Sequence, residues 1–259
     1  MFSELGLQLY TVRQLINDGA SIDELLKKLV DIGYTQVQTA GYETPELANA
    51  AKKHGVKIVG THYNYDRIKN EVEDTVRLHE LLETTNLGLG AMPGWAHEDQ
   101  DALFRFIEEM NKTAEIYSRY GMKLTYHNHS FEFSSLDGKK TVMEYLCEGF
   151  DKNNISFVLD TCWVANSGAD VCDWIEKLEG RIDILHLKDI RSVTVDGWNT
   201  RQEMCEIGRG LIAWDRVLSS AEKTGVKYYV VEQDAYWIDN DPLKSLTASK
   251  KYLDKYLIH

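Results

Sequence analysis

Three short apolar runs in the second half of the chain each lead directly into a side chain that can bind a metal or move a proton. These side chains are Asp160, His186 and Glu232. Taken singly, Asp160 could be a turn or helix cap, and His186 a hydrogen-bonded buried histidine. Glu232 is harder to explain structurally, because a strand buried on both faces seldom ends in an unpaired carboxylate. Together they predict a functional site.

The segment LTYHNHSFEF adds His127, His129 and Glu132 near the end of another apolar run. Three carboxylates with one imidazole form an oxygen-rich site that suits one divalent ion, Mn²⁺, Co²⁺ or Mg²⁺, with Zn²⁺ as a further option. An ion with an open coordination position could bind the oxygens of a hydroxy-carbonyl substrate and stabilise an enediolate. Two glutamates on opposite faces of that substrate could then move protons on and off carbon.

Apolar runs that alternate with amphipathic helical segments must position these residues. The periodicity and the capping boxes Ser21-x-x-Glu24 and Thr141-x-x-Glu144 predict where the helices begin. The predicted strands are residues 5–10, 35–39, 57–60, 87–92, 123–127, 156–159, 182–187 and 227–231. Two of the predicted helices begin at residues 21 and 141. The others cover 44–55, 68–84, 99–120, 170–178, 214–224 and 242–257. Segment 190–211 is predicted to be a loop.

This alternation predicts an α/β fold, a (β/α)8 TIM barrel in which residues 1–259 form a single domain. An open doubly wound sheet is the alternative, but it would place a glycine-rich phosphate loop after the first strand. The segment Thr11-Val12-Arg13 holds no glycine there. The parallel strands of a barrel all end at the same mouth, so residues far apart in sequence can meet at the C-terminal ends of the strands.

The formal net charge of −12 disfavours nucleic acid and anionic membrane surfaces as partners. The N-terminus shows no secretory signal, and no apolar run approaches the roughly 18 residues that span a bilayer. The four cysteines form no C-x-x-C pair and no zinc-finger spacing, as expected of free thiols in a reducing compartment. We therefore expect a soluble, cytoplasmic protein.

Several motifs resemble the xylose isomerase-like barrel superfamily, in particular its sugar phosphate isomerases and epimerases. The resemblance covers nearly the whole chain, and its most specific part is the pairing of YHNHSFEF with HLKD. The motifs are QLYTVR (8–13), AGY (40–42), YHNHSFEF (126–133), LDTCW (159–163), HLKD (186–189), EIGRGLIAW (206–214) and VEQD (231–234).

The resemblance implies one divalent metal held by four protein ligands, which by position are Glu132, Asp160, His186 and Glu232. Glu132 and Glu232 would also be the catalytic acid/base pair, with His129 as the alternative ligand from the fifth strand. Related ketose epimerases carry a histidine where this chain has Trp163, and many members carry a glutamate where this chain has Arg209.

Residues near the other strand ends are expected to contact the substrate. We assign His62, His127 and Lys188 to this role, and Trp95, Trp163 and Trp237 could form apolar walls for the C–H face of a sugar. Arg209 stands between Gly208 and Gly210, which could hold a phosphate. The alternative that we prefer is a glycine turn leading into the helix at Trp214.

The predicted function is therefore that of a metal-dependent isomerase or epimerase of a sugar or related polyhydroxy carbonyl compound. A lyase that acts on an inosose or a 3-keto sugar could use the same metal and bases. A non-catalytic sugar-binding barrel is a further alternative. The DNA-repair endonucleases of the superfamily need three zinc ions and a basic groove, which the charge disfavours. Related proteins are often dimers or tetramers, so a homo-oligomer is also considered.

Overall fold

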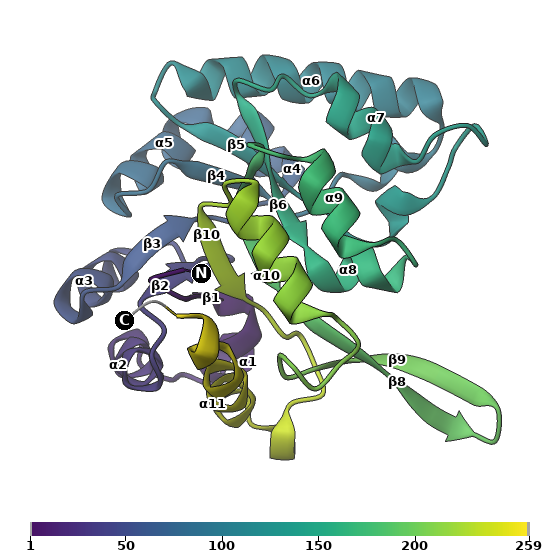
Figure 1. Ribbon diagram of the computed structural model, residues 1–259. Helices are drawn as coiled ribbons and strands as arrows, with labels where there is room; N and C mark the ends of the chain where they lie inside the picture. The colour runs from purple at the N-terminus through teal and green to yellow at the C-terminus, as the bar shows by residue number, and fades with distance from the viewer. Residues whose placement is uncertain (1, 258–259) are drawn as a thin grey trace.

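The computed structural model describes residues 2–257, and eight of its strands form one parallel sheet rolled into a barrel (Figure 1). The strand order is β3-β2-β1-β10-β7-β6-β5-β4. The strands are β1 (Gly6–Gln8), β2 (Gln36–Gln38), β3 (Lys57–Gly60), β4 (Asn86–Leu89), β5 (Lys123–His127), β6 (Ile155–Asp160), β7 (Ile182–Leu187) and β10 (Tyr228–Val231).

The barrel closes where β3 meets β4. The backbone N–H of Thr61 donates to Asn86 O at 3.1 Å, and that of Tyr63 donates to Gly88 O at 2.7 Å. The two backbone segments run so close together that a Cβ atom on Gly88 would lie 1.9 Å from Thr61 O, which excludes any side chain at position 88. The predicted TIM barrel is confirmed.

Helices follow the strands and cover the outside of the barrel (Figure 1). Their predicted starts agree with the structure: Ser21 caps one helix, and Thr141 with Glu144 forms a complete capping box. The segment predicted as one helix over 68–84 is instead two helices, since the backbone breaks at Glu71.

The helices are α1 (Arg13–Asn17), α2 (Ile22–Ile32), α3 (Pro45–His54), α4 (Tyr65–Asn70), α5 (Val72–Leu81), α6 (Gln100–Ser118), α7 (Val142–Gly149), α8 (Thr161–Asn166), α9 (Val171–Lys177), α10 (Trp214–Lys223) and α11 (Pro242–Leu253). Short 3-10 helices are η1 (Leu9–Val12), η2 (Gly94–His97), η3 (Phe131–Phe133), η4 (Ile238–Asn240) and η5 (Asp254–Tyr256). No helix within residues 2–257 is long and apolar enough to cross a membrane.

The barrel interior holds a small apolar cluster separate from the main core between strands and helices. It consists of one side chain from each of β3, β6, β7 and β10: Val59, Val158, Ile184 and Val230. Successive side chains of a strand alternate between its two faces, so the residue two positions later also faces the interior. On β6, β7 and after β10 these next positions are Asp160, His186 and Glu232.

Segment 190–211, predicted as a loop, contains most of an antiparallel hairpin of β8 (Asp189–Asp196) and β9 (Asn199–Cys205) that projects from the barrel (Figure 1). Its two-residue turn is Gly197-Trp198, and Gly197 takes the positive φ of 51° that such turns require. The buried Asp189 carboxylate fixes the base of the hairpin, because it accepts hydrogen bonds from Gly208 N, Gly210 N and Trp214 Nε1.

Candidate metal and acid–base site

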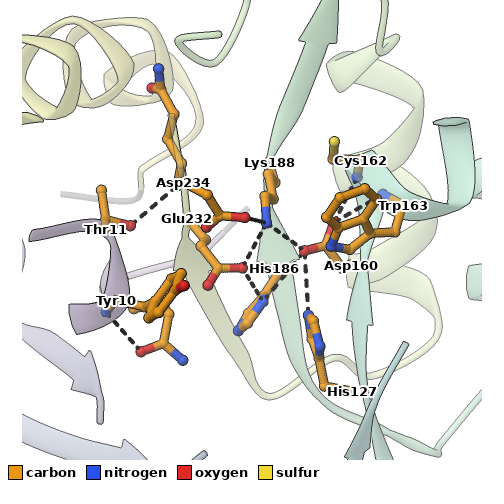
Figure 2. Close-up of polar contacts among 12 residues, drawn as sticks. Tyr10, Thr11, His127, Asp160, Cys162, Trp163, His186, Lys188, Glu232 and Asp234 are labelled. Atoms are coloured by element: carbon orange, nitrogen blue, oxygen red, sulfur yellow. Dashed lines mark hydrogen bonds and ion pairs between the residues drawn. The ribbon is translucent and has the colours of Figure 1, made fainter. Parts of the chain in front are cut away.

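Four buried side chains from consecutive strands of the sheet meet at the mouth of the barrel (Figure 2). The potential ligand atoms of His127, Asp160, His186 and Glu232 all lie within 4.8 Å of one another. None of these residues is more than 5% exposed. His127 ends β5, Asp160 ends β6, His186 lies on β7, and Glu232 follows β10. Strand alternation turns all four side chains inward.

The two imidazoles are oriented by hydrogen bonds on the side away from the carboxylates. His186 Nε2 lies 2.6 Å from Gln38 Oε1, and His127 Nδ1 lies 3.0 Å from Gly90 O. These oxygens can only accept, so each of those nitrogens carries a hydrogen. In the neutral imidazoles the lone pairs are then on His186 Nδ1 and His127 Nε2, which face the carboxylates. Metal-binding histidines are commonly fixed in this way.

The site carries more negative than positive charge. Lys188 Nζ lies 2.6 Å from Asp234 Oδ2 and 3.1 Å from Glu232 Oε2, and 3.5 Å from Asp160 Oδ2. One ammonium therefore faces three carboxylates. Burial acts to raise the pKa of Asp160 and Glu232, but the Lys188 ammonium and nearby imidazoles outweigh it and hold both pKa values below their usual range. Both carboxylates are thus ionised and available to a cation.

The donor atoms fit a divalent metal. His186 Nδ1 is buried and faces both carboxylates, at 3.1 Å from Glu232 Oε2 and 3.6 Å from Asp160 Oδ2. Burial lowers the pKa of His186, but the two carboxylates raise it to about 9, so a proton occupies this nitrogen when no metal does. Two nitrogens and two oxygens are a donor set that Zn²⁺, Co²⁺ and Mn²⁺ accept readily and Mg²⁺ does less well.

Glu132, predicted as a ligand and a base, lies outside this group. Its Oε1 accepts a hydrogen bond from Tyr126 OH at 2.6 Å, and its Oε2 accepts one from His129 N at 2.8 Å. Tyr126 packs against Phe106 and Phe150 between the strands and helices. Burial raises the pKa of Glu132 to about 8. The carboxyl group thus stabilises the turn after β5 and does not reach the cluster.

His127 is the member of the group that β5 supplies. It was predicted to contact substrate, but its position at the last residue of β5 points it inward beside Asp160, at 3.4 Å. Glu132 follows five residues later in η3, where strand alternation no longer decides direction. The predicted set of three carboxylates and one imidazole therefore becomes two of each.

A family model for the xylose isomerase-like TIM barrel matches residues 16–256. The chain belongs to this family. The inosose dehydratase of Bacillus licheniformis is 22% identical over 281 residues, which cover 94% of this chain and 91% of the relative. This match bears out the prediction that the chain is an enzyme.

Two solved structures show how closely the fold is shared. A sugar phosphate isomerase/epimerase from Parabacteroides distasonis has a TM-score of 0.82 at 21% identity, with 98% of each chain covered. An IOLI protein with a bound zinc atom has a TM-score of 0.74 at 15% identity, with 99% of this chain and 100% of that chain covered. The resemblance inferred from the motifs is confirmed at the level of the family.

Two further histidines lie beside the group: His62, predicted to contact substrate, and His129, predicted as the alternative ligand from the fifth strand and not a member of the group. The ring centroids of His62 and His129 each lie 4.8 Å from that of His127. Both rings line a cavity of about 500 Å³ at the mouth, and the Nδ1 atom of each is buried without a hydrogen-bond partner. Burial is the main cause that lowers the pKa of both, to about 3 for His129, so both are neutral and can donate or accept hydrogen bonds.

Of the three tryptophans predicted to form walls of the pocket, one lies near the site and two lie elsewhere. Trp163 lies 5.0 Å from Lys188 Nζ and 5.5 Å from the ring of His129, and its buried Nε1 has no hydrogen-bond partner. Trp95 packs against Tyr65 and Phe106 instead. Trp237 donates its Nε1–H to Gln233 O. Only Trp163 is therefore placed to face a ligand at the cluster.

The glycine pair around Arg209 is a structural turn. The N–H groups of Gly208 and Gly210 donate to Asp189, and a Cβ atom on Gly210 would lie 2.1 Å from that carboxylate. These donors are therefore occupied and do not face the mouth as a phosphate cradle. Arg209 itself is half-exposed, with its closest ion pair to Glu206 at 3.7 Å.

Two residues that position side chains at the site, Gln38 and Asp234, were not predicted. Gln38 orients His186 and is itself held by a hydrogen bond from its Nε2 to Thr61 O at 3.2 Å. Asp234 binds Lys188 at 2.6 Å. Both follow from strand alternation, since Gln38 is a polar residue within a fully buried strand and Asp234 lies two positions after Glu232.

Proposed function

We propose that this chain is a divalent-metal-dependent enzyme that removes a proton from the carbon beside a carbonyl group of a polyhydroxylated substrate. The observation that carries the proposal is the set of two imidazoles and two carboxylates at the barrel mouth, in which His186 Nδ1 and His127 Nε2 are held toward the carboxylates. A divalent ion bound by this set would polarise the substrate carbonyl.

Glu232 is the proposed base. It follows β10, its charge acts on the pKa of both His62 and His129, and Lys188 lies 3.1 Å from its Oε2. Asp160 is less suited, because its Oδ1 already accepts from the backbone N–H of Cys162 and its Oδ2 faces the two imidazoles. His62 and His129 are the proposed partners for substrate hydroxyl groups, and Trp163 for an apolar face.

Elimination of water is the outcome that we favour over epimerisation. A two-glutamate mechanism needs a second carboxylate on the opposite face of the substrate, and Glu132 is hydrogen-bonded elsewhere. In the elimination, Glu232 takes the proton from carbon, the C–H electron pair becomes a C=C bond, and the C–O bond of a neighbouring hydroxyl breaks. That hydroxyl then takes the proton from Glu232 and leaves as water. The full-length similarity to an inosose dehydratase supports this choice.

The proposal is tested by incubating the protein with inososes, 3-keto sugars and ketoses in D₂O, with Zn²⁺, Mn²⁺ or Co²⁺. We expect an inosose or 3-keto sugar to lose one water, detected by mass spectrometry, with a rate that falls at least 10³-fold in Glu232→Gln. Deuterium incorporation at carbon without water loss would instead show an epimerase or isomerase. Absence of both exchange and water loss with every substrate and metal would contradict an enzymatic role.

A further inference from the structure

The β8–β9 hairpin has features of an arm that binds another molecule. The Trp198 side chain at its tip is fully exposed, at 101%, and Val195 beside it is 57% exposed. An isolated two-stranded hairpin is only marginally stable in water, and both of its edges can accept a further strand. An exposed tryptophan on such an arm is typical of a contact residue.

The two faces of this arm differ in charge. Arg191, Arg201 and Glu203 pair with one another on one face, where Arg201 also lies 5.7 Å from the ring of Tyr236. The opposite face carries exposed residues that are small or uncharged: Ser192, Thr194, Thr200 and Gln202. In a chain of net charge −12, such an uncharged strip is a surface on which a second copy meets no electrostatic repulsion.

The uncharged face continues into a pocket at the base of the same arm. This pocket has a volume of about 320 Å³, and Ile190 and Gln202 of the arm line it together with Ala169, Val171, Leu211 and Ile212. Leu211 at its rim is 69% exposed. The lining also includes Asp170 and Arg216, so the pocket combines apolar side chains with polar groups, and its size suits one indole ring with its polar N–H.

We propose that two copies of this chain pair through their arms, so that Trp198 of each copy occupies the pocket at the base of the other. An eight-residue strand spans roughly 25 Å, so two arms laid side by side in opposite directions bring each tip to the opposite base. A two-fold dimer repeats every contact in this way.

Charges at the tip and base of the arm are complementary in this arrangement. Asp196 lies next to the turn and forms no ion pair among residues 2–257. Arg216 lines the pocket, is largely exposed, and lies no closer than 3.8 Å to Asp170, its partner within the chain. Asp196 of one copy would therefore meet Arg216 of the other.

The oligomeric state of the intact protein tests this proposal independently of its activity. We expect sedimentation equilibrium to show a dimer at micromolar concentration and Trp198→Ala to weaken dimerisation at least 100-fold with an unchanged circular dichroism spectrum. Tyr120→Ala, at an aromatic residue after α6 that is 54% exposed, is the control and should leave the dimer intact.

A charge exchange separates the proposed contact from a general effect on folding. Arg216→Glu should weaken the dimer at least tenfold, and the double variant Arg216→Glu with Asp196→Arg should recover most of that loss. A wild-type protein that stays monomeric at 100 μM would overturn the proposal. A wild-type dimer that Trp198→Ala leaves unchanged would also overturn it, because another face would then form the contact.

Discussion

At the scale of single residues, the groups that contact each buried carboxyl group decide its charge and its role. Glu232 and Glu132 are both buried glutamates near strand ends, yet Glu232 faces two positive groups and Glu132 faces a tyrosine hydroxyl and a backbone N–H. The pKa of Glu232 is accordingly held below its usual range, and that of Glu132 is raised to about 8. The two carboxyl groups should therefore respond differently to the same substitution.

Metal content after replacing each glutamate by glutamine tests this difference. Glu232→Gln removes one charged donor, so we expect divalent-metal affinity to fall at least 100-fold. Glu132→Gln should retain the metal of the wild type, since a protonated carboxyl and an amide are similar in shape and charge. Metal analysis after dialysis against a weak chelator measures both. Equal losses in the two variants would show that Glu132 acts on the ion after all.

At the scale of elements, the join between β3 and β4 depends on buried polar groups. His79 on α5 lies 2.9 Å from Thr61 Oγ1 through Nε2 and 3.1 Å from Thr84 O through Nδ1. Thr61 also donates its backbone N–H across the join. His79 is 2% exposed, and burial lowers its pKa from 6.5 to about 4. Burial therefore favours the neutral imidazole at this contact between the helix and the strand ends.

The free energy of unfolding should therefore decrease as the pH falls from 6.5 toward 4. In that range the unfolded chain binds a proton at His79 that the folded chain does not, which costs about 1.4 kcal/mol per pH unit. Urea unfolding of the wild type and of His79→Gln measures the effect. The variant should be less stable at neutral pH but lose less stability on acidification. Parallel curves for the two proteins would contradict this explanation.

At the scale of the whole molecule, the site joins strands that are distant in sequence but adjacent in the barrel. The group draws one residue each from β5, β6 and β7 and one from the end of β10, which pair side by side in the sheet. An ion held by all four residues binds the folded chain only, so it must stabilise the entire barrel.

Removing the metal should accordingly lower the melting temperature. An ion at 100 times its dissociation constant adds about 2.7 kcal/mol to the free energy of unfolding, which corresponds to roughly 5–10 °C for a domain of this size. Calorimetry of the metal-loaded protein with and without EDTA measures this shift. Glu232→Gln is the control and should melt at nearly the same temperature in both conditions. A wild type that is insensitive to EDTA would exclude tight metal binding.

The local pattern of apolar runs, caps and glycines determined the barrel, because alternating strands and amphipathic helices have few ways to bury their apolar faces. It also located Asp160, His186 and Glu232, each directly after an apolar run. Gly197 was a hairpin signal within the predicted loop, because glycine suits the first of the two residues of a tight turn.

Only the tertiary structure placed His127 in the group, where Glu132 or His129 had been expected, and showed that Asp189 occupies the glycine turn. Each of these two features depends on the direction of a side chain at or beyond the end of a strand. Within a strand that direction follows from alternation, as it does for His127, whereas in the turn beyond it depends on distant partners such as Tyr126. The exposure of Trp198 likewise depends on how far the arm stands from the barrel, which no local pattern encodes.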